Sequence, residues 1–335
     1  MLRVWLEFAV CVALIGYAGT KLSRYGDVIA EKTGFSGSWI GLVLLATVTS
    51  LPELVTGITS VTVAKAPNIA IGDALGSCVF NLLILVILDL MYREESIYSR
   101  AHRGHVLSAG FGVILIGFVG FSLLIGPRGF APVLGHVGLY TPIIILLYLI
   151  AMQTVFRYER EHLEEYIEQR ARRYEDITLR QAAARYTAAA IAVVATGIWL
   201  PFVGVELAQQ MGWTKTFVGT LFVALATSVP ELVVTIAAMR IGALDMAIGN
   251  LLGSNLFDVL VIAVDDLFFT TGPILAHVSP MHAITAMSAL VMTGIAIVGL
   301  FYRPRKRLLR TVGWVSLALF MVYLLNTYVL FLHGE

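Results

Sequence analysis

The sequence predicts an all-α integral membrane protein, in which ten transmembrane helices form two inverted five-helix repeats with broken helices at the centre. Three observations predict this class: the composition, the number of long apolar stretches and an internal repeat. Of the 335 residues, 58% are hydrophobic and only 13% are charged, whereas a soluble domain usually has about 25% charged residues. The composition therefore excludes a soluble protein, and the net charge of +1 gives no indication of nucleic-acid binding.

Ten stretches are long and apolar enough to cross a bilayer, which requires about 20 predominantly apolar residues. They cover residues 4–20, 38–64, 68–91, 106–126, 133–155, 182–208, 216–238, 243–264, 277–301 and 311–332. The first stretch has no small-residue cleavage site, so we expect a span and not a signal peptide. Residues 156–181 are rich in Arg, Glu and Tyr, and we expect a helical surface linker there. This linker divides the chain into two repeats, residues 1–155 and 182–335.

The distribution of Lys and Arg predicts the orientation in the membrane. All but four of the 23 basic residues lie in the loops that follow odd-numbered spans, and the four are Arg3, Lys65, Arg128 and Lys215. Short cytoplasmic loops collect positive charge, so we expect the odd loops and the 156–181 linker to be cytoplasmic. Both termini should then be non-cytoplasmic.

Two segments of the chain repeat each other. Residues 34–55 align without gaps to residues 212–233, and each copy contains the pattern Thr-Ser-x-Pro-Glu, at 49–53 and at 227–231. Five predicted spans precede the second copy. Because five is an odd number, the two copies must have opposite orientations in the membrane. An inverted repeat with interrupted helices in matching positions is typical of secondary transporters.

Each Thr-Ser-x-Pro-Glu pattern lies in the middle of a predicted span. Proline removes a backbone donor and clashes with the carbonyl four residues earlier, so Pro52 and Pro230 should free carbonyls near Thr49 and Thr227. Broken backbone at membrane depth is tolerated only inside protein or beside a cavity. Free carbonyls, hydroxyls and an adjacent carboxylate make an all-oxygen site, which hard cations such as Ca²⁺ and Na⁺ prefer.

A second repeated pattern, Gly-[Asp/Asn]-x-x-Gly-Ser, adds a polar stripe to the span that follows each kink. The polar residues recur every four positions and therefore share one face of a helix. They are Asp73, Ser77 and Asn81 in the first copy, and Asn250, Ser254 and Asp258 in the second. With Glu53 and Glu231 there are four carboxylates inside spans, and holding each one ionised at the bilayer centre costs at least about 2.5–3.5 kcal/mol. No basic residue is near them in sequence, so they demand cations or protons.

Other polar residues in the spans are weaker candidates for a site. We expect Glu7 and Glu206 to form local hydrogen bonds or to lie at the membrane interface, and not to be ligands. Asp89, Asp265 and Asp266 fall near span ends, where we expect their side chains to reach the interface. The seven histidines show no metal-ligand spacing, and the two cysteines support neither a disulfide framework nor a CxxC metal site.

These motifs resemble those of the cation/calcium antiporter superfamily, specifically the prokaryotic sodium/calcium exchangers. Segments 46–81 and 224–258 are similar to the two alpha-repeats of that family. The resemblance implies four central ligands, which are Glu53, Asn81, Glu231 and Asp258. It also implies sodium coordination by hydroxyls and carbonyls at Ala46, Thr49, Ser50, Ser77, Ala224, Thr227, Ser228 and Ser254. Asp73 departs from the family, which usually has Asn there, and we retain it as a candidate ligand that adds a carboxylate.

The resemblance implies a secondary antiporter that exchanges Ca²⁺ for Na⁺ by alternating access at a carboxylate site near the midplane of a prokaryotic plasma membrane. We expect no enzyme activity, no cofactor besides the transported ions, and no nucleic-acid or obligatory protein partner. Within transport, the alternative is an H⁺-coupled divalent-cation exchanger in which Asp73, Glu53 and Glu231 release protons as the metal binds. The alternatives from other classes are a passive cation channel and an intramembrane protease with two carboxylates.

Overall fold

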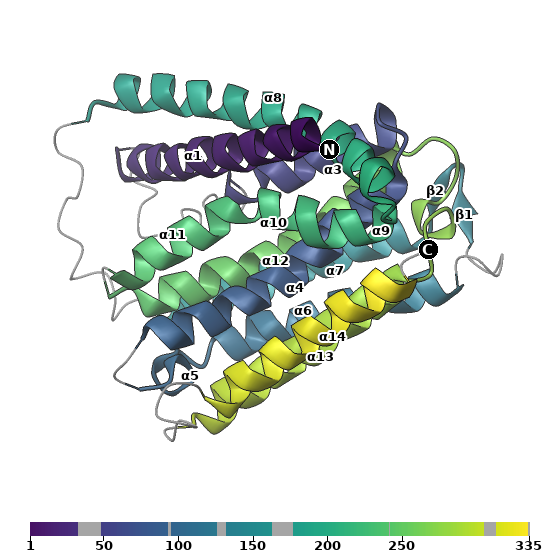
Figure 1. Cartoon of the computed structure of the whole chain (residues 1–335). Coiled ribbons are helices and arrows are strands. Elements are labelled where there is room, and N and C mark those ends of the chain that lie inside the picture. Colours follow the sequence, from purple (N-terminus) through teal and green to yellow (C-terminus); the bar gives the residue numbers. More distant parts are fainter. Residues whose placement is uncertain are drawn as a thin grey trace.

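Long helices lie side by side in a bundle (Figure 1). The computed structural model describes residues 1–32, 48–92, 95–125, 132–162, 177–240, 242–304 and 313–333. In these ranges eight helices are long and apolar enough to span a membrane, and a bent pair makes a ninth. The eight are α1 (Leu2–Lys32), α4 (Pro67–Met91), α6 (His105–Ile125), α7 (Tyr140–His162), α8 (Leu179–Met211), α12 (Leu244–Phe268), α13 (His282–Tyr302) and α14 (Trp314–His333).

The second predicted span, 38–64, is represented by the short helix α3 (Leu51–Thr62). Residues 33–47 lie outside the described ranges, so the count of ten spans stays a prediction. The same holds for most of the predicted linker, because α7 ends at His162 and α8 begins at Leu179, while residues 163–176 are not described.

The predicted span 133–155 begins too early. Its first residues form a small antiparallel hairpin of β1 (Val133–Leu134) and β2 (Val137–Gly138), and the helix begins only at Tyr140. Gly135 at the turn has a φ of +67°, which glycine adopts without steric penalty. Apolar composition alone did not distinguish this hairpin from the first turns of a helix.

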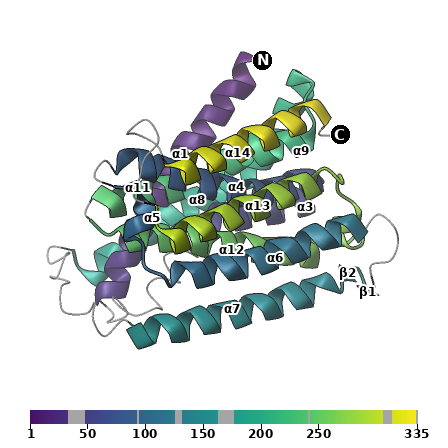
Figure 2. The same cartoon turned by 90° about the horizontal axis from the view of Figure 1, so that it is seen from below.

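The helices α4 and α12 form the centre of the bundle. In the most apolar stretch of each, 78% of the residues are buried, compared with 28% in α7 and in α14. Figure 2 shows α7 at the edge of the bundle. The polar stripes on α4 and α12 are therefore enclosed by protein, where their hydrogen-bonding groups can find partners that lipid does not offer.

A π-helical turn lies beside α4. The bent span consists of α9 (Lys215–Val218), the π-helix η4 (Gly219–Val223), α10 (Ala224–Thr227) and α11 (Val229–Arg240), with a bend of 44° before α11. Gly72 and Gly76 of α4 face η4, and a Cβ atom added to Gly72 would lie only 2.9 Å from the backbone nitrogen of Thr220. Glycine allows this close approach, which brings the stripe of α4 against the bent span.

The two carboxylates near the end of α12 are fully buried, so the expectation that Asp265 and Asp266 reach the interface is wrong. Asp266 accepts hydrogen bonds from the backbone N–H groups of Gly138 and Ile274, and from the hydroxyls of Tyr140 and Thr141, over 2.5–2.9 Å. These donors belong to β2, α7 and the short 3₁₀ helix η5 (Ile274–Ala276). Asp266 therefore fastens the end of α12 to three other elements.

Asp89 makes a matching set of contacts near the end of α4, and it is also fully buried rather than interfacial. Its carboxylate accepts from the backbone N–H of Ile97 at 3.0 Å, in the short helix α5 (Ile97–Arg100), and from Ser316 Oγ of α14 at 2.7 Å. The N–H of Gly313 lies 3.4 Å away. Both carboxylates thus hold a short helix eight residues further on and the start of a long helix from the other half of the chain.

Candidate ion-binding site

The first copy of Thr-Ser-x-Pro-Glu lies at a helix break. Ser50 leaves the helical conformation, with φ −89° and ψ 14°, and α3 begins at the next residue with Pro52 in its first turn. Thr49, Ser50 and Glu53 are all buried. The side chain of Glu53 is therefore in the first turn of a helix inside the bundle, where the positive end of the helix dipole favours a carboxylate.

The second copy breaks at the equivalent serine. Ser228 has φ −85° and ψ 6° between α10 and α11, and Pro230 and Glu231 follow in the first turn of α11. The backbone carbonyl of Ser228 accepts from Leu232 at 3.1 Å, as that of Ser50 does from Leu54 at 3.3 Å. The predicted interruption at this motif is therefore present in both described copies.

The two breaks contact each other through their serine and glutamate side chains. Ser50 Oγ donates to Glu231 Oε1 at 3.1 Å, and Ser228 Oγ lies 3.4 Å from Glu53 Oε1. Ser228 Oγ is also 3.0 Å from Ser77 Oγ on α4. Each serine thus holds the carboxylate that belongs to the other copy, and hydroxyl and carboxylate oxygens converge at the crossing.

Further along the stripes, polar side chains join α4 to α12. Asn81 Nδ2 donates to Asn255 Oδ1 at 3.0 Å and lies 3.4 Å from Asp258 Oδ2. Asn255 in turn donates to the backbone carbonyl of Cys78 at 3.2 Å, and Cys78 Sγ lies 3.9 Å from Asp258 Oδ2. The predicted ligands Asn81 and Asp258 are therefore neighbours, held by a residue that the sequence analysis had not selected.

Asn255 could have been found from the repeat. It follows Ser254 directly, as Cys78 follows Ser77, so the aligned copies place Cys78 and Asn255 at one position. In the structure these two residues contact each other across the bundle. An amide at a position where the other copy has a thiol was the available signal.

Asp73 lies one helix turn before Ser77 and bonds to the opposite copy. Thr227 Oγ1 donates to Asp73 Oδ1 at 2.8 Å. The amide of its aligned partner Asn250 lies 3.3 Å from Thr235 Oγ1, within the same half. Thr235, a helix turn beyond Glu231, is a second polar neighbour that the sequence analysis did not select. The two halves therefore have different hydrogen-bond partners at the position where the sequence departs from its family.

Several buried oxygens in this region have no hydrogen-bond partner in the described part of the chain. Each of the four carboxylates uses one oxygen in a hydrogen bond and leaves the other unpartnered. The unpartnered atoms are Glu53 Oε2, Asp73 Oδ2, Asn81 Oδ1, Glu231 Oε2, Asn250 Oδ1, Ser254 Oγ and Asp258 Oδ1. A buried polar atom without a partner is costly, so this set of acceptors fits a ligand that accepts oxygen lone pairs, namely a cation.

Carboxylates alone do not build a metal centre here. Within the described residues, no three His, Cys, Asp or Glu side chains lie close enough to hold a metal ion together. A cation at the crossing would need hydroxyl, amide or backbone oxygens as well, which is the mixed oxygen set that Ca²⁺ and Na⁺ accept. Among the residues described, no salt bridge joins the four carboxylates to a basic residue, so a cation or protons would have to neutralise them.

The remaining residues that the sequence singled out lie at the start of α10, near the N-terminus or outside the described ranges. Ala224 is buried at the start of α10, and its carbonyl accepts from the N–H of Ser228 at 3.0 Å. Ala46 lies outside the described residues. Glu206 accepts from Arg3 at 2.6 Å, and Glu7 forms an ion pair with the same Arg3 at 3.4 Å, so both acids pair with a basic side chain near the N-terminus. The ligand roles themselves stay predictions.

Comparison with known proteins gives a family and a fold. The sequence model of a family described as "Sodium/calcium exchanger protein" matches residues 3–158 and 184–329. Inner membrane protein YrbG of Escherichia coli is 25% identical over 331 residues, covering 98% of both chains. Sodium/calcium exchanger MaX1 of Methanosarcina acetivorans is 30% identical over 125 residues, covering 37% of this chain and 33% of that protein.

Two solved structures share the fold. The sodium-calcium exchanger NCX_Mj has a TM-score of 0.61 at 20% identity, covering 98% of this chain and 99% of its own. The H⁺/Ca²⁺ exchanger CAX has a TM-score of 0.67 at 14% identity, covering 98% and 86%. At these identities the likeness describes the helical architecture.

Proposed function

We propose that this chain, which belongs to the sodium/calcium exchanger protein family, exchanges Ca²⁺ for Na⁺ across the membrane at the crossing of the two helix breaks. The observation that carries the proposal is the reciprocal pair of contacts between Ser50 and Glu231 and between Ser228 and Glu53. Buried carboxylates and hydroxyls from both halves meet there. The names of the relatives support Ca²⁺ exchange and differ in the counter-ion, since MaX1 and NCX_Mj are sodium/calcium exchangers and CAX is an H⁺/Ca²⁺ exchanger.

The central ligands would be Glu53, Asn81, Glu231 and Asp258, each of which has an unpartnered oxygen. Their three carboxyl groups carry up to three negative charges, which one Ca²⁺ or several Na⁺ largely neutralise. An uncompensated buried charge costs several kcal/mol, so the protein would seldom occlude the site when it is empty and ionised. This penalty enforces exchange and prevents leak.

The helices α1 and α8 are the candidate moving elements. They lie together on one side of the bundle (Figure 1) and contain the predicted spans 4–20 and 182–208. Glycines face the breaks: Gly16 and Gly19 of α1 pack against Val229 and Pro230, and Gly197 of α8 packs against Val55. Surfaces of small residues let helices approach closely, so the pair could slide against a fixed core of α4 and α12.

The inverted repeat is part of the proposal. The serine breaks match in the two copies, and so do the contacts of Asp89 and Asp266. The positive-inside rule puts both termini outside the cytoplasm. A cysteine at His333 should then react with a membrane-impermeant maleimide in intact cells, whereas one at Arg157 should not. The reverse pattern would contradict this orientation; the two natural cysteines are buried.

Proton coupling is the second candidate function, and Asp73 favours it. A carboxylate replaces an amide at this position, is buried, and bonds to Thr227. A carboxyl group can release a proton when a cation binds nearby, and an amide cannot.

The deciding experiment is ⁴⁵Ca²⁺ uptake into proteoliposomes with Na⁺, K⁺ or pH gradients imposed separately. The proposal expects uptake driven by an outward Na⁺ gradient and not by K⁺. Uptake driven by the pH gradient alone would establish the proton-coupled alternative. Uptake without any counter-gradient would identify a channel.

A further inference from the structure

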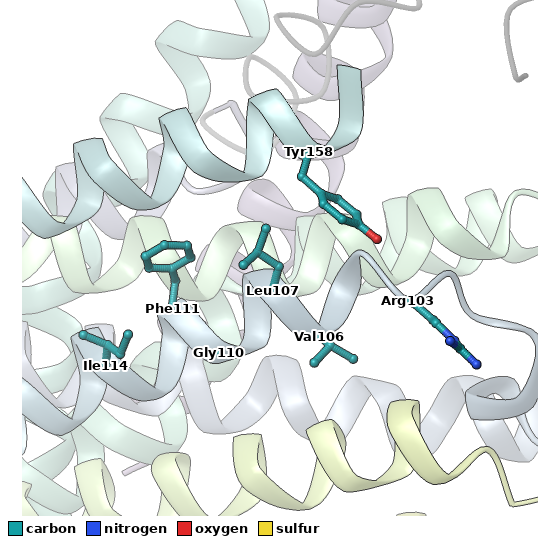
Figure 3. Close-up of a pocket in the computed structure, with 7 residues that line it drawn as sticks. All are labelled: Arg103, Val106, Leu107, Gly110, Phe111, Ile114 and Tyr158. Atoms are coloured by element: carbon teal, nitrogen blue, oxygen red, sulfur yellow. The ribbon is translucent and has the colours of Figure 1, made fainter. Parts of the chain in front are cut away.

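A groove whose lining contains none of the candidate ion ligands runs along one face of α6 beside α7 (Figure 3). Its volume is about 440 Å³. The apolar floor consists of Val106, Leu107, Gly110, Phe111 and Ile114, which recur at helical spacing on one side of α6. All five are partly or well exposed. The groove is therefore an open, apolar surface feature of a membrane-spanning helix.

The two ends of the groove differ in charge. Arg103 lies just before α6 begins, is exposed, and forms no ion pair with any carboxylate among the described residues. Tyr158 reaches from α7 toward the same side of α6 as Leu107 (Figure 3). Its ring packs on Gly104, where an added Cβ atom would lie 2.9 Å from it. A cation and an aromatic hydroxyl thus stand at one end, and the other end is purely apolar.

The distance from the polar end of the groove to its apolar end matches the depth of one bilayer leaflet. From His105 to Ile114 the helix rises about 14 Å, and the hydrocarbon core of a bilayer is about 30 Å thick. Arg103 then lies at the membrane surface, and Ile114 lies near the middle. Arg binds phosphate oxygens in a planar, bidentate geometry.

We propose that this groove binds one anionic phospholipid, with its phosphate on Arg103 and Tyr158 and an acyl chain along Leu107, Gly110 and Ile114. The charge of Arg103 selects an anionic headgroup, and the apolar floor is accessible from the lipid phase. A water-soluble ligand has no route to Phe111 and Ile114 at membrane depth. Basic sites between transmembrane helices are known places for anionic headgroups. The site is separate from the proposed exchange function.

Two pairs of variants test the two ends of the groove. Arg103→Gln removes the cation, and Arg157→Gln removes an exposed cation on α7 that does not line the groove. Gly110→Leu places a larger side chain on the floor of the groove. The change should not disturb the packing, because there is open space around a Cβ atom added at Gly110. Gly294→Leu in α13 is its control, since the same space is free around Gly294. Thermal unfolding and gel filtration verify the fold of all four proteins.

Native mass spectrometry of the full-length protein, titrated with phosphatidylglycerol or phosphatidylcholine, measures the one-to-one affinities. The wild type should prefer phosphatidylglycerol by about fivefold or more, the effect expected for one basic residue near the membrane surface. Arg103→Gln should abolish the preference and keep phosphatidylcholine binding. Gly110→Leu should weaken both lipids, while Arg157→Gln and Gly294→Leu should change neither.

Several results would overturn the proposal. They are equal binding of the two lipids by the wild type, equal effects of Arg103→Gln and Arg157→Gln, and no effect of Gly110→Leu. Displacement of phosphatidylglycerol by inorganic phosphate at equal concentration would also overturn it, because the site would then recognise phosphate and not lipid.

Discussion

Buried carboxylates occur in two regions of this molecule, and they differ in how many donors they receive. At the ends of α4 and α12, Asp89 and Asp266 are bonded through both oxygens to backbone N–H groups and hydroxyls. At the crossing of the helix breaks, Glu53 and Glu231 accept from side-chain hydroxyls, and each keeps one unpartnered oxygen.

We infer two roles from this difference, which the sequence does not distinguish. A carboxylate whose oxygens are saturated by protein donors stabilises the fold and has no lone pair directed at a ligand. A carboxylate with one unpartnered oxygen next to hydroxyls has coordination capacity left. The hydrogen-bond donors around an acid, more than its depth in the membrane, indicate what it does.

The largest effect should come from the crossing. Glu53→Gln and Glu231→Gln should each reduce ⁴⁵Ca²⁺ uptake at least about 100-fold, because under the proposed function each removes a charged oxygen that would replace water around a divalent ion. Thermal stability should change little, since glutamine keeps the acceptor for the serine. Glu206→Gln, at the exposed pair with Arg3, is the control and should transport normally. Near-normal uptake by either central variant at matched expression would contradict the idea that an unpartnered carboxylate oxygen marks an ion ligand.

The next effect concerns stability. Asp266→Ala should lower the free energy of unfolding by about 3 kcal/mol or more, because it strands several buried donors that cost about 1–3 kcal/mol each. Asp89→Ala should cost less, since one of its donors, the N–H of Gly313, lies 3.4 Å away in a long contact. Thermal unfolding in detergent measures both, and the protein that remains folded should still bind Ca²⁺. Unchanged melting temperatures would show that these contacts are not structural.

The sequence predicted the breaks well and the end contacts poorly, for a physical reason. A Pro-Glu pair in an apolar span disrupts the helix by local chemistry, so Ser50 and Ser228 are where the motif indicates. The role of Asp89 depends on Gly313 and Ser316, more than two hundred residues away. Span hydropathy carries no information about such partners. The internal repeat did carry some information about these contacts. Asp89 and Asp266 are separated by the same number of residues as Asp73 and Asn250, so they occupy equivalent positions in the two copies.

Replacing Asp73 should have a smaller effect on transport than replacing the central glutamates, and it tests whether Asp73 belongs with these acids. It has one donor, Thr227, and one unpartnered oxygen, so it resembles the central acids. If it carries a proton for part of the cycle, rising pH removes that proton, adds negative charge beside the site and strengthens cation binding. Asp73→Asn should keep exchange but flatten its pH dependence between roughly pH 5 and 8. An unchanged pH profile would mean that Asp73 acts only as a hydrogen-bonding group, as asparagine would.

The smallest effect should come from Asp265, which receives no donor at all in the described residues. Both of its oxygens are buried and unpartnered, and they face Gly57 of α3, where an added Cβ atom would lie 2.6 Å from each. No protein group here stabilises a charge, so Asp265→Asn removes no hydrogen bond that holds the fold. We expect uptake within about twofold of wild type and a melting temperature that is unchanged or higher, because burying an isolated charge is unfavourable. A large loss of Ca²⁺ affinity would instead indicate that Asp265 is a ligand. The number of hydrogen-bond donors around a buried carboxylate would then not be enough to tell structural acids from ion ligands.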